Sequence, residues 1–472
     1  MPGFSVAFSS AAGALSAIQQ ALNTVQNNIV NANTPGYATE RANFSAKAFD
    51  PVQGLMGGID VSLSSTRDQY LETSVHRETS ALGLLEQSSS LLGTLQSAFS
   101  AFGDSGVPGA LSAFANSFSA LSAAPNDVSA RAGVIRAAST LALAFNQTAS
   151  RISQVATDAS QQAASTAGEI NALATHIAAL NATIQKGAGN DAGIAADLNH
   201  SLDSLSELVN ISVARNADGT ASVLVDGQTP LVLGSDAFAV AVKPRPADPY
   251  PEYPGGDAGI MLVDHNGADI TGQAAQGKLG ALLQIRNQTV PYYLGSESRQ
   301  GELNHLADSI ASRVNTLITT AQTQAGATVS PLFVYHPTDD TKIASSLTIG
   351  SVTADQIVTG DGISSNGVAI ELAAITDPTN AADLMSNGQT FTAFYGQLAG
   401  RAGGDAAQAA AELETQQSLT AQAQNQRNQA SGVSLNDQAA QLLSLQQAYQ
   451  ATARIITILN SLSETAVNII PQ

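Results

Sequence analysis

The most informative stretch near the amino terminus is Leu15-Ser-Ala-Ile18-Gln-Gln-Ala-Leu22-Asn-Thr-Val25-Gln-Asn-Asn28-Ile29-Val-Asn31-Ala-Asn33-Thr34-Pro35-Gly36-Tyr37. Its apolar residues recur at alternating spacings of three and four, the pattern of a helix that packs against another helix. These seam positions are Leu15, Ile18, Leu22, Val25 and Ile29. Pro35 cannot continue a helix, and Gly36 permits a turn. The stretch therefore predicts a helix, a stop and a turn.

A second seam lies at the opposite end of the chain, where no glycine or proline interrupts the sequence between Val433 and Ile470. Its apolar positions are Leu435, Leu442, Leu445, Tyr449, Ile456 and Leu459. Neither seam has a partner close to it in sequence, so we expect the two ends to pair as an α-helical coiled coil. A heptad pattern of this length more often marks an intramolecular helix pair than an oligomer interface, and both uses remain open.

The residues that end the first helix carry a family resemblance. They closely resemble the amino-terminal signature of bacterial flagellar rod, hook and hook-associated proteins, at Asn28, Asn31, Asn33, Thr34, Pro35, Gly36 and Tyr37. The carboxyl-terminal segment, with Gln447, Tyr449 and Ala453, resembles the matching terminal helix of that family. The resemblance implies that the two termini pack together within each subunit. It also implies contacts to neighbouring subunits or to a central channel from Asn28, Gln446, Gln447 and Gln450.

The composition excludes several classes of protein. Only 12% of the 472 residues are charged and the formal net charge is −19, so the chain offers no basic surface to nucleic acid. The absence of cysteine excludes disulfides and thiolate chemistry. No segment approaches the roughly 18 to 20 uninterrupted apolar residues of a membrane span. The first ten residues lack the basic region of a secretory signal peptide. We expect neither nucleic-acid binding nor membrane insertion.

Proline usage indicates where the long helices lie. Nine of the sixteen prolines fall between Pro230 and Pro337, whereas 126–229 and 379–470 contain none. A cap at Asn126 or Asp127 opens an apolar pattern that predicts a helix of about 60 residues. Gly187 and Gly189 should end it. Further helices are expected over 71–99, 303–317 and 390–430.

Two parts of the chain indicate β structure. The segment from Ile211 to Val225 predicts a hairpin that turns at Asp218-Gly219, followed by a strand at 231–233. The proline-rich segment 244–254 should be an exposed loop. Short apolar runs between glycine and aspartate turns over 331–389 indicate a small mixed or β-rich insertion.

Internal matches narrow the resemblance to the hook-associated members of the family that form the junction between hook and filament. The matching segments include 67–71, 121–127, 169–173, 277–282 and 306–307. A long helical stretch also separates the terminal motif from the first expected hairpin at Ile211, whereas rod and hook proteins pass quickly into β domains. The chain departs from the family before Asp203, where an arginine is usual, and this departure weakens one expected local ion pair.

The predicted fold is α+β and multi-domain. Its parts are a terminal coiled-coil domain (1–60 with 431–472), a helical rod domain (61–209 with 275–330 and 390–430), a β-rich domain (210–274) and the insertion at 331–389.

No residue pattern in the sequence indicates catalysis. The six histidines lack metal-binding spacing, and no Gly-x-Ser-x-Gly elbow occurs. The glycines at 187–193 follow an expected helix instead of a strand, so they indicate helix termination and not a dinucleotide loop. We expect no catalytic residue, no cofactor and no metal, and we expect the protein not to be an enzyme.

The resemblance implies a structural subunit of the bacterial flagellum, extracellular and exported by the flagellar type III apparatus without a cleaved signal. Its expected partners are further copies in a ring, hook protein, a second junction protein or flagellin, and an export chaperone on the carboxyl-terminal helix. The alternatives are another axial protein (hook or distal rod), or a flagellar-type protein that carries a hydrolase or adhesin insertion.

Overall fold

The structure is a computed structural model that describes residues 2–47, 58–99, 106–188, 191–336, 339–378 and 380–468. Its internal contacts divide the chain into two compact units. Unit 1 comprises Met1–Ser80, Asn171–Phe238 and Gln417–Gln472, and unit 2 comprises Ala81–Ile170 and Ala239–Gln416. The long helices α2 (Gln69–Phe99), α4 (Val128–Thr183) and α11 (Phe391–Ser431) each contribute residues to both units.

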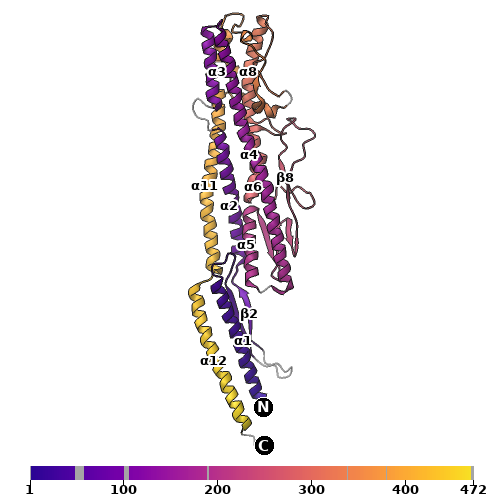
Figure 1. Cartoon of the computed structure of the whole chain (residues 1–472), viewed down its shortest axis with the longest axis vertical. Helices are drawn as coiled ribbons and strands as arrows, with labels where there is room; N and C mark the ends of the chain where they lie inside the picture. Colours follow the sequence, from indigo (N-terminus) through magenta and orange to yellow (C-terminus); the bar gives the residue numbers. More distant parts are fainter. Residues whose placement is uncertain are drawn as a thin grey trace. The chain divides into compact units, whose positions relative to one another are not determined.

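Unit 1 contains both ends of the chain. Helix α1 (Pro2–Val30) lies beside α12 (Leu435–Asn468), and Figure 1 shows the two termini at the same end of this pair. The helices are antiparallel, because the side chain of Asn28 bonds to Gln438 and that of Gln19 to Tyr449. A two-stranded hairpin packs on α1. It is formed by β1 (Glu40–Lys47) and β2 (Gly58–Ser65), in a register that pairs Glu40 with Ser65.

The remainder of unit 1 joins helix α5 (Ala192–Leu208) to an antiparallel sheet of order β3-β4-β5-β6. The strands are β3 (Ile211–Arg215), β4 (Ala221–Val225), β5 (Thr229–Leu233) and β6 (Asp236–Ala237). The inward residues Val223 and Leu231 are fully buried. Strands β3 and β4 are the hairpin predicted at 211–225, and β5 contains the strand predicted at 231–233.

Unit 2 is built mainly from helices, several of which run as roughly parallel ribbons in Figure 1. They are α2 (Gln69–Phe99), α3 (Gly106–Ala123), α4 (Val128–Thr183), α6 (Gly277–Gln284), α7 (Val290–Leu294), α8 (Glu302–Gln324), α10 (Gly367–Ala373) and α11 (Phe391–Ser431). The described residues include two single-turn π-helices, η1 (Ile184–Ala188) after α4 and η2 (Ile285–Thr289) between α6 and α7. Phe114 is fully buried and contacts Phe118 and Phe333, with ring centroids 5.1 and 5.7 Å away.

The predicted long helix is confirmed. Helix α4 has 56 residues and follows Asp127, whose carboxylate accepts a hydrogen bond from the backbone N–H of Ser129. Gly187 adopts a φ of 109° in the π-helical turn that follows, as expected of a residue that ends the helix. Gly189, the second predicted stop, lies outside the described residues. The helices expected over 71–99, 303–317 and 390–430 correspond to α2, α8 and α11.

Short elements occupy the two least regular parts of unit 2. Strands β7 (Ala241–Pro244) and β8 (Ile260–Val263) form a hairpin across the proline-rich segment, which is exposed over 244–250 as predicted. The segment 331–389 is mixed and not β-rich, since its only described strands are β9 (Phe333–Val334) and β10 (Thr348–Ile349). Its helical turns are η3 (Asp340–Lys342), α9 (Ile343–Ser346), η4 (Ala354–Gln356), α10 and η5 (Ala381–Asp383).

One helical stretch of the described residues, Val128–Ala188, is long and apolar enough to cross a membrane by length and composition alone. The stretch is not an uninterrupted apolar run, because exposed polar residues such as Gln147 and Arg151 occur within it. Its opposite face buries Leu141, Phe145 and Ile152 completely. A single helix of this kind is a weak indication, because core helices of globular proteins meet the same criterion.

Two helices and one hairpin are notable among the elements that were not predicted. Helices α3 and α5 are absent from the sequence interpretation, since glycine and proline at the start of α3 obscured its apolar spacing. The hairpin β1–β2 corrects the expectation that the first hairpin of the chain lies at Ile211, with a long helical stretch before it. Seven of the eight β1 side chains are polar, charged or alanine, and most of the strand is exposed, so it lacks the alternation that marks a half-buried strand.

Candidate assembly site at the terminal helices

The contact between α1 and α12 uses small and branched side chains of α1. Ala17, Ile18, Ala21 and Val25 are buried there, each 9% exposed or less. The other predicted seam positions of α1, Leu15, Leu22 and Ile29, are half-buried. The seam of α1 therefore faces the interior of unit 1, as its spacing implies.

Helix α12 presents two apolar stripes. Its seam residues Leu442, Leu445, Tyr449, Ile456 and Leu459 are half-buried, whereas Leu435 is 53% exposed and contributes little to the contact. A second stripe, which we call the outer stripe, consists of Ile455, Ile458 and Leu462, each about half exposed. The outer stripe was missed in the sequence although its spacing of three and four is visible there, because the seam beside it has the longer repeat.

Asn28 joins three elements of unit 1. Its side-chain amide donates to the carbonyl of Glu40 (2.9 Å) and to Gln438 (3.0 Å). Its amide oxygen accepts from the Tyr37 hydroxyl (2.8 Å) and from the Glu40 backbone N–H (3.0 Å). Asn28 is completely buried. The expectation that it contacts neighbouring subunits is therefore wrong, because all four of these bonds are made within the chain. Burial, with the negative charge of Glu40, raises the pKa of Tyr37 to about 12, so its hydroxyl stays a donor at neutral pH.

The turn after α1 is fixed by Gly36. Its φ is 73°, which glycine adopts readily and other residues rarely do. A Cβ at this position would collide with the carbonyl oxygen of Ala196 and lie 2.8 Å from the backbone nitrogen of His200, both in α5. Thr34 donates to Asn31 (3.1 Å), while Asn33, Thr34 and Pro35 are exposed. Of the carboxyl-terminal motif, Gln447 is exposed and Ala453 is half-buried.

The bend between α11 and α12 is tied to the hairpin by backbone bonds. The N–H of Thr39 donates to the carbonyl of Ser431 (2.8 Å), and its hydroxyl donates to that of Gly432 (2.8 Å). The hydroxyl of Ser431 donates to the carbonyl of Thr66, and the N–H of Thr66 donates to that of Thr39. These bonds join the bend to the residues on either side of the hairpin, Thr39 and Thr66.

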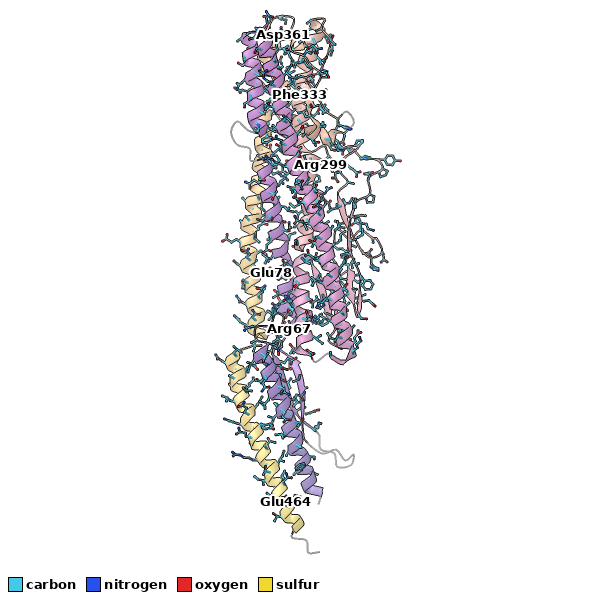
Figure 2. All side chains as sticks on the ribbon, viewed as in Figure 1. Arg67, Glu78, Arg299, Phe333, Asp361 and Glu464 are labelled. Atoms are coloured by element: carbon cyan, nitrogen blue, oxygen red, sulfur yellow. The ribbon has the colours of Figure 1, made fainter. Side chains whose placement is uncertain are left out.

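A buried charge network lies beside this bend. Arg67, labelled in Figure 2, donates to the carbonyl of Gly36 and to Glu72. Arg427 donates to Glu72 (3.3 Å) and Asp203 (2.8 Å), and His76 lies 3.1 Å from Asp203. Burial raises the pKa of the Asp203 carboxyl, but bonds and charge from His76 and Arg427 outweigh burial and hold the pKa below its ordinary value. No arginine directly precedes Asp203 in the sequence. Its arginine partner is Arg427, which lies 224 residues later in the chain.

Three residues of this charge network could also act as metal ligands. Glu72, His76 and Asp203 offer ligand atoms within 4.8 Å of one another. The guanidinium of Arg427 bonds both carboxylates, so it already supplies the positive charge that a cation would bring.

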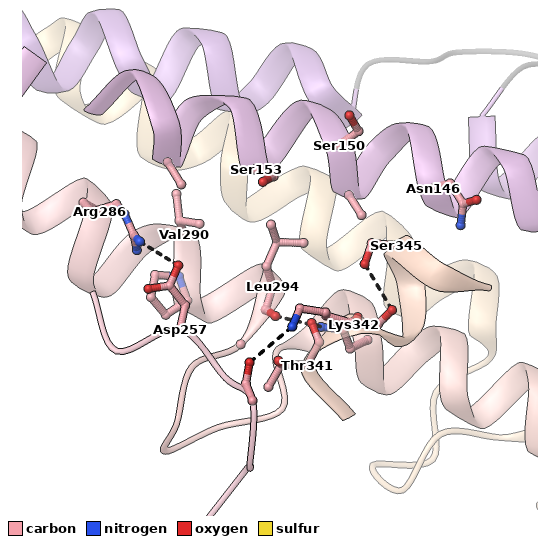
Figure 3. A pocket seen from close by; sticks show the side chains of 16 residues that line it. Asn146, Ser150, Ser153, Asp257, Arg286, Val290, Leu294, Thr341, Lys342 and Ser345 are labelled. Atoms are coloured by element: carbon pink, nitrogen blue, oxygen red, sulfur yellow. Dashed lines mark hydrogen bonds and ion pairs between the residues drawn. The ribbon is translucent and has the colours of Figure 1, made fainter. Parts of the chain in front are cut away.

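Unit 2 contains a cavity of about 660 Å³, shown in Figure 3. Its charged side chains pair with neighbouring groups: Arg286 with Asp257 (2.6 Å) and Lys342 with Asp339 (2.5 Å). Asn146 donates to the carbonyls of Ala344 and Leu347. These polar groups hold the walls of the cavity together.

The terminal helices carry very little charge. Helix α1 has no charged residue, and α12 has only Asp437, Arg454 and Glu464. Together they contribute a net charge of −1, so the rest of the chain carries −18 of the formal −19. The outer stripe thus lies on an almost neutral helix pair, which suits contact between identical subunits.

Comparisons with known proteins place these features among flagellar proteins. The family model described as flagellar hook-associated protein FlgK helical domain matches residues 92–333. Models of the flagella basal body rod protein and of the flagellar basal body rod FlgEFG protein C-terminal region match 8–37 and 424–469.

Individual relatives extend over nearly the whole chain. Flagellar hook-associated protein 1 of Bacillus subtilis is 26% identical over 96% of both chains. The Escherichia coli protein of that name is 23% identical over 96% of this chain and 98% of its own. The solved structure of the flagellar hook junction protein FlgK from Burkholderia pseudomallei aligns at 24% identity with a TM-score of 0.48, covering 56% of this chain and 47% of that one.

Proposed function

The chain belongs to the FlgK family of flagellar hook-associated proteins, whose helical-domain model spans more than half of it, and we propose that it joins the flagellar hook to the filament. The observation that carries the proposal is the pairing of the charge-poor terminal helices, which leaves the outer stripe exposed beside the seam. The match over 92–333 favours this role over that of a hook or distal-rod subunit.

The outer stripe supplies the contact between copies, and the paired termini form the inner wall of a ring. Burying an isoleucine or leucine contributes roughly 1.5 to 3 kcal/mol, so three such residues per subunit favour assembly strongly. Gln446, Gln447 and Gln450, all exposed, contact neighbours or the channel.

The same exposure is a liability before assembly, so an export chaperone covers α12 until the subunit reaches its place. The protein acts outside the cell after type III export and has a structural, non-enzymatic role. Its neighbours are hook protein on one side and a second junction protein or flagellin on the other.

The four-part domain division expected from sequence is retained within this proposal. Its terminal domain (1–60 with 431–472) provides the ring. Its helical domain (61–209, 275–330 and 390–430) provides the body, and the parts at 210–274 and 331–389 provide the outer surface.

The experiment replaces the outer stripe in a strain whose own copy of the gene is deleted. Ile455→Asp with Ile458→Asp adds two charges to the interface, where an unpaired buried charge costs several kcal/mol. Electron microscopy should then show hooks without filaments, and flagellin should appear in the medium. Thr457→Asp with Ser461→Asp adds the same charge to exposed positions outside the outer stripe and should restore swimming. Normal swimming with the isoleucine variant would refute the outer stripe as the contact.

A further inference from the structure

The connection between β7 and β8 is restricted by covalent geometry. From Lys243 to Pro254 it contains five prolines, at positions 244, 246, 249, 251 and 254, and none of them follows another proline. Proline fixes its own φ near −65° and pushes the residue before it toward extended or polyproline II conformation. In these twelve residues the five prolines therefore have a fixed φ, and the five residues before them disfavour helical conformation, before any tertiary contact forms.

The connection is also displayed on the surface of unit 2, beside β8 in Figure 1. Every residue from 243 to 250 is exposed, and Tyr250 is 90% exposed. Glu297 holds the connection at two points: its carboxylate accepts from the Asp248 N–H (3.0 Å), and its carbonyl accepts from the Tyr253 N–H (2.9 Å). The N–H of Arg245 donates to the carbonyl of Gly259 (3.0 Å). The exposed prolines are thus presented on a fixed backbone.

The residues displayed have the composition of a polyproline ligand. Pro246-Ala-Asp-Pro249 forms a P-x-x-P unit, and Lys243 and Arg245 supply positive charge before it. A preformed polyproline II segment loses little conformational entropy on binding, and its usual receptor is a groove lined by aromatic side chains. We infer that residues 243–249 are a docking ligand for a partner protein with such a groove. The chain bends at Pro249 and Tyr250 and turns between Tyr253 and Gly256, so the rest of the connection lies outside this ligand.

This inference is separate from assembly. The ligand lies in unit 2, whereas the outer stripe belongs to unit 1. The docking role of residues 243–249 can therefore be tested, and can prove wrong, without affecting the proposed role at the junction.

The test uses the full chain and a purified SH3 domain that selects basic P-x-x-P ligands and has a tryptophan in its groove. Because the chain has no tryptophan, fluorescence excited at the red edge of tryptophan absorption reports the groove alone. Titration should give a saturable change, and a P-x-x-P peptide that fills the groove should reverse it. A change that this peptide fails to displace, or no change at all, would overturn the inference.

Variants locate the contact. Pro246→Ala with Pro249→Ala should weaken binding by about tenfold or more, equivalent to at least 1.4 kcal/mol. Pro251→Ala with Pro254→Ala, which spares that unit, should bind as the parent does. Glu297→Ala should weaken binding by a smaller factor, because it frees the backbone but keeps the prolines. Unchanged thermal unfolding would show that each variant is folded, and equal affinity of all variants would refute the assignment.

Discussion

Asn28 of α1 satisfies hydrogen-bonding groups of β1, of α12 and of Tyr37 with one side chain. Asn28→Ala leaves the N–H and carbonyl of Glu40, the Tyr37 hydroxyl and Gln438 without this partner. Since each orphaned buried group costs about 1 to 3 kcal/mol, we expect a loss of roughly 2 kcal/mol or more in the unfolding free energy of unit 1. Urea denaturation measures it. Asn27→Ala, at an exposed neighbouring position, should change little, and equal losses would deny Asn28 its role.

Gly36 and Gly13 allow the glycine-to-alanine substitution to be compared in two environments. Gly36→Ala adds a methyl group against the backbone of α5 at a positive φ, so we expect clear destabilisation of unit 1 and a lower melting temperature. Gly13→Ala in α1 meets nothing within 4 Å and should be neutral or stabilising, because alanine is the better helix former. Similar melting temperatures for the two variants would contradict the close approach to α5.

The lowered pKa of Asp203 makes unit 1 sensitive to acid. A carboxyl whose pKa is lower in the folded than in the unfolded state contributes stability above the unfolded value, about 3.9, and that contribution is lost as pH falls through the folded value. Unfolding free energy measured from pH 6 to 3 should therefore fall, and Asp203→Asn should flatten the dependence. Asp197→Asn removes an Asp–His pair whose side chains are about half exposed and should leave the slope unchanged.

At the scale of elements, the two faces of α12 should respond differently to charge. Leu445→Asp with Ile456→Asp changes half-buried seam residues, so we expect faster hydrogen exchange in α1 and a less stable unit 1. Ile455→Asp with Ile458→Asp changes the outer stripe and should leave exchange in α1 as it was. Hydrogen exchange followed by mass spectrometry compares them. If both pairs accelerate exchange equally, the assignment of the two faces is wrong.

Elements were predictable where sequence pattern and packing agree. Helix α4 could be located from Asp127 to Gly187 because its cap, its apolar spacing and its stop are all local signals. The hairpin β1–β2 could not, because its stability comes from packing on α1 and its own residues are mostly polar. The outer stripe shows that spacing identifies an apolar face without saying whether the chain itself covers it.

The site was predicted less completely than the fold. The turn at Gly36 was found from local chemistry, although its partner in α5 was not. The buried role of Asn28 depends on Gln438, and the charge balance of Asp203 depends on Arg427. Contacts between residues hundreds of positions apart leave no local pattern in one sequence.

At the level of the whole molecule, removal of α12 should affect unit 1 and leave the folding of unit 2 unchanged. A chain ending at Gly432 keeps every residue of unit 2, so the unfolding transition of that unit should keep its midpoint in calorimetry. Helix α1 loses its partner, and an unpaired helix of this kind is marginal in water, so its amides should exchange rapidly. Assembly should be lost. A truncated protein that still restores swimming would show that α12 is dispensable for the junction.

The nearly neutral terminal helices have a consequence for how dissolved salt affects the subunit. Counterions screen the repulsion between two acidic bodies as they approach, so added salt should speed the first encounter of subunits. Once α1 and α12 meet their neighbours, little charge remains at the contact for counterions to screen. The rate at which a subunit leaves the proposed ring should therefore be almost independent of ionic strength, so added salt should change how fast the proposed junction forms and scarcely change how long it lasts.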